Sequence, residues 1–193
     1  MKRRRLVMLL SFIMLISLTT GILFLKDKMN NDQQEVQYLS ASWPYNYSNL
    51  EEISKASDLI ALIKVEGVSK SYETRGIPVT EYKVQVLNPI YGTDETQLTL
   101  FMTGREDKDK KIEIKDDPLP YADEEFLVFC KQNADGTITV LSGPQGRLVY
   151  TDGKLNSLNA VKENAMEINS RSSIQIVNED AETIIAQIKS YVE

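Results

Sequence analysis

A run of twenty uncharged residues near the start of the chain restricts how the rest of the sequence can be organised. Residues 6–25 contain only four polar side chains, Ser11, Ser17, Thr19 and Thr20. A helix of this length measures about 30 Å, which matches the hydrocarbon thickness of a bilayer. A helix packed inside a soluble domain would be amphipathic, whereas this one would be apolar all round. We therefore expect a membrane anchor or a signal segment at residues 6–25.

The flanks of this segment indicate whether it stays in the membrane and how it is oriented. A secretory signal has an apolar region of about 7–15 residues that ends at a small-residue cleavage site. The only such site, at residues 19–21, is followed by four further apolar residues, which favours an uncleaved anchor over a cleaved signal. The basic cluster at positions 2–5 outweighs the charge beyond the segment, so we expect the N-terminus in the cytoplasm.

These features predict a single-pass protein of the cell membrane, with a secreted protein as the alternative. Residues 1–5 would form a cytoplasmic basic end, residues 26–47 a stalk, and residues 48–193 an extracytoplasmic domain. The stalk begins with polar residues and ends in aromatic ones. We expect this aromatic end, residues 43–47, to pack back onto the domain.

Composition excludes several classes of function. Four of the 22 basic residues and none of the 28 acidic residues precede position 26, so the rest of the chain carries a formal charge of −10. That charge repels phosphate backbones, and no nucleic-acid partner is expected. The chain has no histidine and one cysteine, which excludes histidine-dependent nucleophilic catalysis and the common zinc sites. No catalytic residue, metal or cofactor is therefore predicted.

The region after the stalk has the pattern of short strands. A continuous apolar run opens residues 59–68, as is typical of a strand that is buried on both faces. Strict alternation then places Tyr82, Val84 and Val86 on one face of a second strand. We expect that face to line the core.

Two Asp-Gly pairs predict hairpins in the second half of the chain. Asp135-Gly136 should join strands at residues 124–131 and 137–142 in a tight turn, with both central residues at positive φ. Asp152-Gly153 should form a second hairpin. The lone cysteine, Cys130, ends an alternating apolar segment and is interpreted as a small buried residue.

Two helices are expected to flank the strands. A capping box of Ser48 and Glu51 predicts a short helix over residues 49–55. A second helix is predicted over residues 179–192, with Asn178 as its N-cap. Its apolar stripe consists of Ala181, Ile184, Ile185, Ile188 and Val192. The expected fold is mainly β, a small antiparallel barrel with flanking helices and an N-terminal transmembrane or signal helix.

The order of these segments resembles a known family. The stretches SDLIALIKVEGV, EYKVQVLNPIYG, TQLTLFMTG, PLPYADEEFLVFCKQ and GPQGRLVYTDGKL, roughly within residues 57–155, are similar to uncharacterised exported proteins of Gram-positive bacteria. Those proteins in turn resemble the OB-type barrel of the netrin module and the tissue inhibitors of metalloproteinases. The resemblance implies an OB-like barrel. It does not imply protease inhibition, because the inhibitors' zinc-chelating N-terminal cysteine and their disulfides are missing here.

A charge-rich stretch, residues 105–120, precedes the fourth strand. Its pattern predicts a solvated loop or an exposed hairpin. Carboxylates at Glu106, Asp107 and Asp109 lie close together in the sequence. However, lysines are interleaved with them and no loop glycine follows, so a calcium loop is not expected.

The candidate binding residues lie on the loop side that carries Tyr121 and the turn at residues 142–147. Tyr121, Gln145 and Arg147 are predicted to contact a partner there. OB-type barrels often serve as binding platforms, which is an argument by analogy. The expected function is a non-enzymatic module, tethered outside the membrane, that binds an unknown extracytoplasmic protein or envelope component.

The alternative is an envelope hydrolase that uses two carboxylates, as sugar-cleaving enzymes do. The nearest candidates are Asp123, Glu124 and Glu125, beside Tyr121. A catalytic acid needs a pKa raised by burial, whereas three adjacent acids at the start of a strand are expected to be exposed. We therefore favour the binding module.

Fractionation of cells that express a C-terminally tagged chain tests the anchor. We expect the full-length protein to remain in the membrane pellet after an alkaline wash, because a twenty-residue apolar segment holds it there. Recovery from the medium of a product shortened by about 20 residues, the length of a removed signal, would establish cleavage instead.

Overall fold

The computed structural model describes residues 35–107, 110–161 and 174–193. The predicted membrane segment and the first part of the predicted stalk, residues 26–34, lie outside these residues. No helix in the described ranges is long and apolar enough to cross a bilayer.

The chain divides into two compact units. One comprises residues 1–35 and 108–110, nearly all of which lie outside the described ranges. The other comprises residues 36–107 and 111–193 and holds the fold discussed below.

Strands are the main secondary structure of the described chain. They are β1 (Glu35–Leu39), β2 (Leu59–Thr74), β3 (Ile77–Tyr91), β4 (Gln97–Glu106), β5 (Lys110–Ile114), β6 (Glu125–Gln132), β7 (Ile138–Val140), β8 (Arg147–Thr151), β9 (Lys154–Ser157) and β10 (Glu179–Asp180). The helices are α2 (Leu50–Ala56), the four-residue α3 (Leu158–Val161) and α4 (Ala181–Val192), with a 3-10 turn, η1 (Gly143–Gly146).

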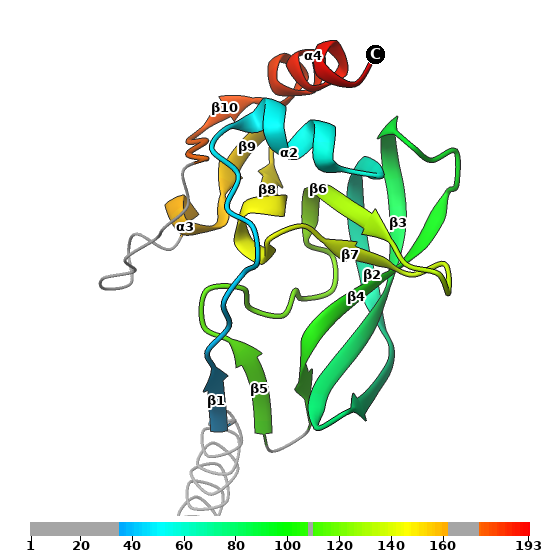
Figure 1. The fold of residues 1–193 in the computed structure, drawn as a ribbon, viewed down its shortest axis with the longest axis vertical. Helices are drawn as coiled ribbons and strands as arrows, with labels where there is room; N and C mark the ends of the chain where they lie inside the picture. The colour runs from blue at the N-terminus through cyan, green and yellow to red at the C-terminus, as the bar shows by residue number, and fades with distance from the viewer. Residues whose placement is uncertain (1–34, 108–109, 162–173) are drawn as a thin grey trace, which may run out of the picture. The chain divides into compact units, whose positions relative to one another are not determined.

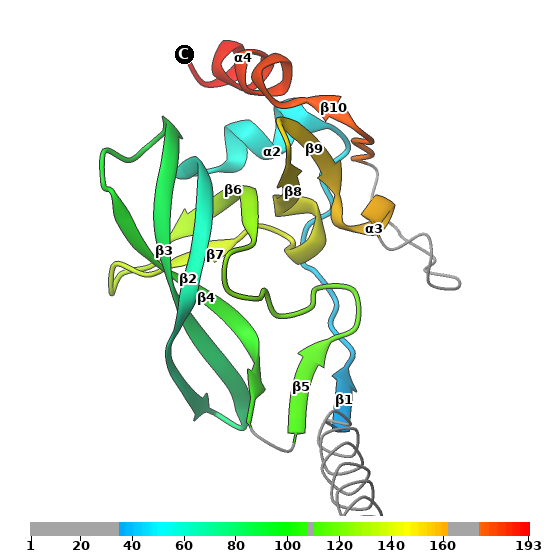
Figure 2. The ribbon, with the colours of Figure 1, turned by 180° about the vertical axis from the view of Figure 1, so that it is seen from behind.

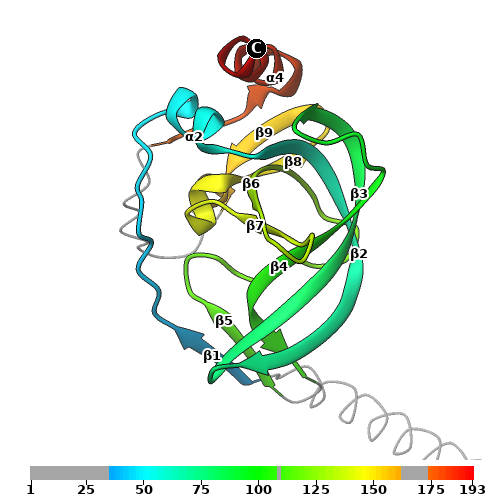
Figure 3. The same ribbon diagram turned by 45° about the vertical axis from the view of Figure 1, so that its right-hand side comes forward.

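Five of these strands close into a barrel (Figure 1, Figure 3). β2 pairs with β3, β3 with β4, β4 with β7, β7 with β6, and β6 with β2 again. The predicted mainly β fold with a small barrel and flanking helices is therefore present. The barrel is not wholly antiparallel, however, because β4 and β7 run parallel. The sheet continues past β4 to β5 and β1, and past β6 to β8, β9 and β10, as the view from behind also shows (Figure 2).

The barrel interior is a continuous apolar core. The predicted inward face of β3 is confirmed, since Tyr82 and Val84 are buried in this core. Phe126, Val128 and Cys130 of β6 lie in the same core, as the alternation of that strand predicted. Burial raises the pKa of the Cys130 thiol, which keeps it protonated and unreactive.

A second core lies outside the barrel wall. The outward face of β2 and β6, with Ile60 and Phe129, packs against Ile53 of α2, Ile188 of α4 and Leu155 of β9. The first half of β2 is consequently buried on both faces. This double burial explains why the strand begins with a continuous apolar run rather than an alternating one.

The two Asp-Gly pairs form different turns. Asp152 and Gly153 both have positive φ, at 50° and 79°, and join β8 to β9 in the two-residue hairpin that the sequence predicted. At the other pair only Gly136 has positive φ, and the amide of Gly136 donates to the carbonyl of Asn133. The expectation of positive φ at both central residues is wrong there. The connection is a longer loop in which the Asp135 carboxylate accepts from the amide of Thr137.

Helices α2 and α4 both begin later than predicted. The N-cap of α2 is Asn49, whose side chain accepts from the amide of Glu52, and the Glu52 carboxylate accepts from the amide of Ser48. The capping box is therefore displaced by one residue from Ser48 and Glu51. Asparagine and serine cap helices about equally well, so the local sequence does not separate the two registers.

The start of α4 is set by the sheet. Glu179 and Asp180 pair with Leu155 and Lys154 as β10, which keeps them extended. Asp180, and not Asn178, is the N-cap of α4, and its carboxylate accepts from the amide of Thr183. The hydrogen bonds of the β9–β10 ladder thus override the earlier helix start that the acidic residues indicated.

Substitution of Ile188 by aspartate tests the packing of α4 on the second core. Ile188 is fully buried, so Ile188→Asp should lower the free energy of unfolding by several kcal/mol, because it places a charge in an apolar core. Ile185 is only half-buried, and Ile185→Asp should cost clearly less. Urea denaturation of residues 26–193 provides the measurement. Equal losses for the two variants would show that α4 does not pack through Ile188.

Candidate functional site

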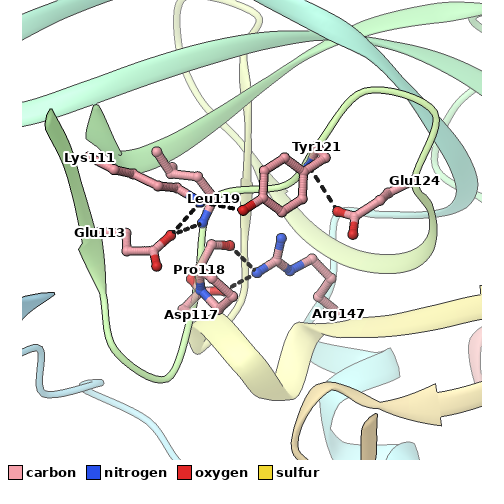
Figure 4. A network of polar contacts seen from close by, with 8 residues as sticks. All are labelled: Lys111, Glu113, Asp117, Pro118, Leu119, Tyr121, Glu124 and Arg147. Atoms are coloured by element: carbon pink, nitrogen blue, oxygen red, sulfur yellow. Dashed lines mark hydrogen bonds and ion pairs between the residues drawn. The ribbon is translucent and has the colours of Figure 1, made fainter. Parts of the chain in front are cut away.

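The connection between β5 and β6 carries Tyr121 and lies over Arg147 (Figure 4). We refer to residues 115–124 as the β5–β6 loop. Leu119, near its middle, is buried in the barrel core. The loop is therefore part of the packed domain, and its polar contacts decide how Tyr121 is presented.

Arg147, the first residue of β8, connects this strand to the loop through two hydrogen bonds. Its Nη2 donates to Asp117 Oδ1 at 2.7 Å and to the carbonyl oxygen of Pro118 at 2.7 Å. The guanidinium lies 4.9 Å from the centroid of the Phe126 ring. Arg147 is 1% exposed, so this ion pair is fully buried. Loss of one partner from a buried pair is strongly destabilising, because the other charge remains in a medium of low polarity.

A second buried ion pair lies on β5. Lys111 Nζ is 2.9 Å from Glu113 Oε2, and the same carboxylate oxygen accepts from the amide of Leu119 at 3.2 Å. Burial acts to lower the pKa of Lys111, but the hydrogen bonds to Glu113 and Tyr121 outweigh it and raise this pKa overall. Lys111 therefore stays charged and holds the middle of the loop through Glu113.

These contacts correct the interpretation of the charge run. The predicted hairpin does form, since β5 pairs with β4. However, Lys111 and Glu113 are buried instead of exposed. Both side chains point to the same face of β5 because they are two residues apart, and there they neutralise each other.

Tyr121 is held from one side and open on the other. The Lys111 ammonium lies 4.5 Å from the ring centroid and donates to the Tyr121 hydroxyl at 3.2 Å. The amide of Tyr121 donates to Glu124 Oε2 at 2.9 Å. The residue nevertheless remains 60% exposed. The ring is thus fixed at its edge, at one face and at its backbone while it faces solvent.

The end of the loop is attached to β2. The amide of Asp123 donates to the carbonyl of Val65 at 2.8 Å, and the amide of Val65 donates to the carbonyl of Glu124 at 2.9 Å. Asp123 has a φ of 69° and an ion pair of 2.9 Å with Lys64. Two of the three candidate hydrolytic acids, Asp123 and Glu124, are therefore exposed and engaged in holding this turn.

Gln145 performs a different structural task. Its side-chain oxygen accepts from the amide of Tyr47, and its side-chain nitrogen donates to the carbonyl of Tyr47, both at 3.0 Å. Ser142 Oγ donates to the carbonyl of Tyr45 at 2.7 Å. The turn that contains Gln145 thus holds residues 43–47 against the domain.

The aromatic residues at the end of the predicted stalk differ in their packing. The Trp43 ring lies directly against Gly143, where an added Cβ would come within 2.2 Å of it. Gly143 also has a φ of 52°, which favours glycine. Tyr47 packs against the second core, whereas Tyr45 is exposed. The expected packing of this segment onto the domain therefore holds for two of its three rings.

Of the three predicted binding residues, only Tyr121 presents an exposed side chain. Gln145 and Arg147 are buried, and both are engaged within the chain. The sequence interpretation missed Lys111 and Glu113, although their alternation with Ile112 and Ile114 indicated a shared face.

The group that the loop offers to a partner is the exposed aromatic ring of Tyr121. Its buried charges are already matched to one another, as Lys111 with Glu113 and Arg147 with Asp117. Among the described residues, no group of three or more acidic or cysteine side chains is placed to hold a metal ion.

Comparison with known proteins adds no assignment. No protein-family model matches the sequence, and no curated protein matches it either. Function must therefore be argued from the site itself.

Removal of the Arg147 guanidinium tests the buried ion pair. Arg147→Met removes the buried guanidinium that donates to Asp117 and Pro118 and should cost about 3–5 kcal/mol in the free energy of unfolding. The double variant Arg147→Met/Asp117→Asn removes both charges and should recover a large part of that loss. Denaturant titration of residues 26–193 compares the two. A double variant no more stable than the single one would contradict a charge-pairing role.

Proposed function

We propose that this protein is a non-enzymatic binding module, tethered outside the cytoplasmic membrane by residues 6–25, that binds an extracytoplasmic protein or envelope component through Tyr121. The observation that carries the proposal is the exposure of Tyr121 on a loop that polar contacts hold at its start, its middle and its end. Exposed tyrosines in flexible loops are common. Here, Lys111 contacts the Tyr121 ring and belongs to one of the two buried ion pairs that hold the loop. Burying these four charged groups is costly, because each loses its hydration.

Preorganisation is the physical advantage of this arrangement. Tyrosine supplies a large amphipathic surface and is enriched among the residues that dominate binding energy. Ordering a loop during association reduces affinity, so a loop that is already ordered binds more tightly. The bonds from Arg147, Glu113 and Val65 to the loop keep that ordering cost low.

The barrel supports the assignment to a binding platform. We infer that it belongs to the OB type, because its strand order β2-β3-β4-β7-β6 describes a five-stranded barrel with non-sequential closure. Barrels of this type bind diverse ligands on their strands and loops, so the fold alone does not select the partner.

The carboxylate hydrolase has weaker support. Catalysis by a carboxylic acid requires burial that raises its pKa. The Asp123 side chain is 84% exposed and is paired with Lys64. Glu124 accepts from the amide of Tyr121 and so contributes to the shape of the turn. The geometry therefore favours presentation of Tyr121 over hydrolysis.

Capture of the partner by tagged protein in native membranes tests this function. Tyr121→Ala removes the ring and should weaken binding by ~2 kcal/mol, which is about thirtyfold in Kd. Tyr45→Ala removes a similarly exposed tyrosine that belongs to a different segment, held by Ser142, and should leave capture unchanged. Partners are identified by photo-crosslinking and mass spectrometry and then titrated.

The two variants separate the possible outcomes. A partner retained by Tyr45→Ala and lost by Tyr121→Ala supports the proposal. Equal capture by the wild type and Tyr121→Ala would show that the binding surface does not include Tyr121.

A further inference from the structure

The outer edge of β1 terminates the sheet. Within the part of the chain that the structure describes, the strand order begins at β1, and its neighbour is β5 (Figure 1). The strand reads EVQYL and is exposed over nearly its whole length. Natural edge strands are commonly protected by lysine, proline or extreme shortness. The opposite edge, β10, has two residues and leads directly into α4, whereas β1 has five and contains neither lysine nor proline.

The backbone direction of β1 can be derived from one hydrogen bond. The carbonyl of Leu39 accepts from the amide of Lys115, on the side of β1 that faces β5. Successive residues of a strand direct their backbone groups to opposite edges. Gln37 therefore shares the direction of Leu39, while Val36 and Tyr38 direct their N–H and C=O groups toward the open edge.

We propose that β1 pairs antiparallel with β1 of a second copy of this chain, about a twofold axis at Gln37. In this register Val36 faces the partner's Tyr38, and each such pair exchanges two backbone hydrogen bonds. All outward groups of Val36 and Tyr38 are then satisfied in both copies. Gln37 faces the partner's Gln37 at the intervening position, where the two Cα atoms of an antiparallel ladder approach to about 4.5 Å.

Self-complementarity argues for a second copy as the occupant. Val36 and Tyr38 are 39% and 58% exposed and lie on one face, where they would form two apolar cross-strand pairs. The single charge of the strand, Glu35, would face the partner's Leu39, so no like charges oppose each other. If the pairing shifted by one residue, the outward N–H and C=O groups of Val36 and Tyr38 would face residues whose own backbone groups point away. The hydrogen bonds between the two strands would then be lost, which makes this register specific.

The interface is small, so its strength depends on local concentration. A five-residue strand pair buries far less than the surface of a typical stable interface. Anchoring in a shared membrane raises the effective concentration of the two copies. This last contribution rests on the anchor proposed above, whereas the pairing geometry does not.

Disulfide trapping of the full chain in its native membranes tests the pairing. Gln37→Cys places two thiols opposite each other within bonding distance and should double the apparent mass on a non-reducing gel after mild oxidation. Glu35→Cys is the matched control on the same face. Its two copies would be separated by about 13 Å along the strand and should stay monomeric. The native Cys130 is buried and should not contribute.

A proline supplies the second arm. Val36→Pro in the Gln37→Cys background removes an N–H that points away from β5, a position where an edge strand tolerates proline. Dimer trapping should then be lost while the domain stays folded. Equal trapping of Gln37→Cys and Glu35→Cys, the absence of trapping, or trapping of a different protein by the thiol of the Gln37→Cys variant would overturn the proposal. Trapped dimers recovered from the medium would contradict the proposed membrane anchor and would leave the β1 pairing supported.

Discussion

The buried ion pair between Arg147 and Asp117 is the interaction on which the loop architecture depends. It joins the first residue of β8 to a loop thirty positions earlier in the chain. Two charges are removed from water, which is costly, and the carbonyl of Pro118 and the ring of Phe126 offset part of that cost. Apolar residues could close the barrel more cheaply. The guanidinium instead makes directional hydrogen bonds to Asp117 and to the carbonyl of Pro118, which an apolar side chain would not supply.

That position determines the rest of the site. With Asp117 and Pro118 held by Arg147, Leu119 enters the barrel core and its amide meets Glu113. Glu113 neutralises Lys111, and Lys111 supports the face and hydroxyl of Tyr121. The exposed ring is therefore the last member of a chain of contacts that begins in β8. This sequence of dependence connects the packing of the barrel with the surface that we propose for binding.

Local patterns predicted the parts of the fold that local physics controls. The apolar run that begins at Leu59 indicated double burial, alternation at Tyr82 and Val84 indicated the core face, and Asp152-Gly153 indicated a two-residue turn. The turn at Asp135 was interpreted wrongly because a glycine at positive φ serves a longer loop as well as a two-residue one.

The site depended on contacts between distant residues. Gln145 bonds to Tyr47, 98 positions away, and Arg147 bonds to Asp117, 30 positions away. The turn residues around Gln145 and Arg147 indicated a surface loop, and nothing in them encodes the partners that bury these side chains. Tyr121 was a candidate because its loop was expected to lie on the same side of the barrel as the turn at residues 142–147. The buried pair that supports Tyr121, Lys111 and Glu113, lies within residues 105–120, which were predicted to be solvated.

Amide hydrogen exchange at Leu119 reports whether the β5–β6 loop is fixed in the native structure. Its N–H donates to the buried Glu113 carboxylate, in a loop that two ion pairs hold in place. If the loop is part of the fixed structure, this amide should exchange about as slowly as those of the barrel strands, because both would require global unfolding. Exchange at the rate of an exposed loop, with the strands still protected, would show that the loop opens independently and that Tyr121 is not preorganised.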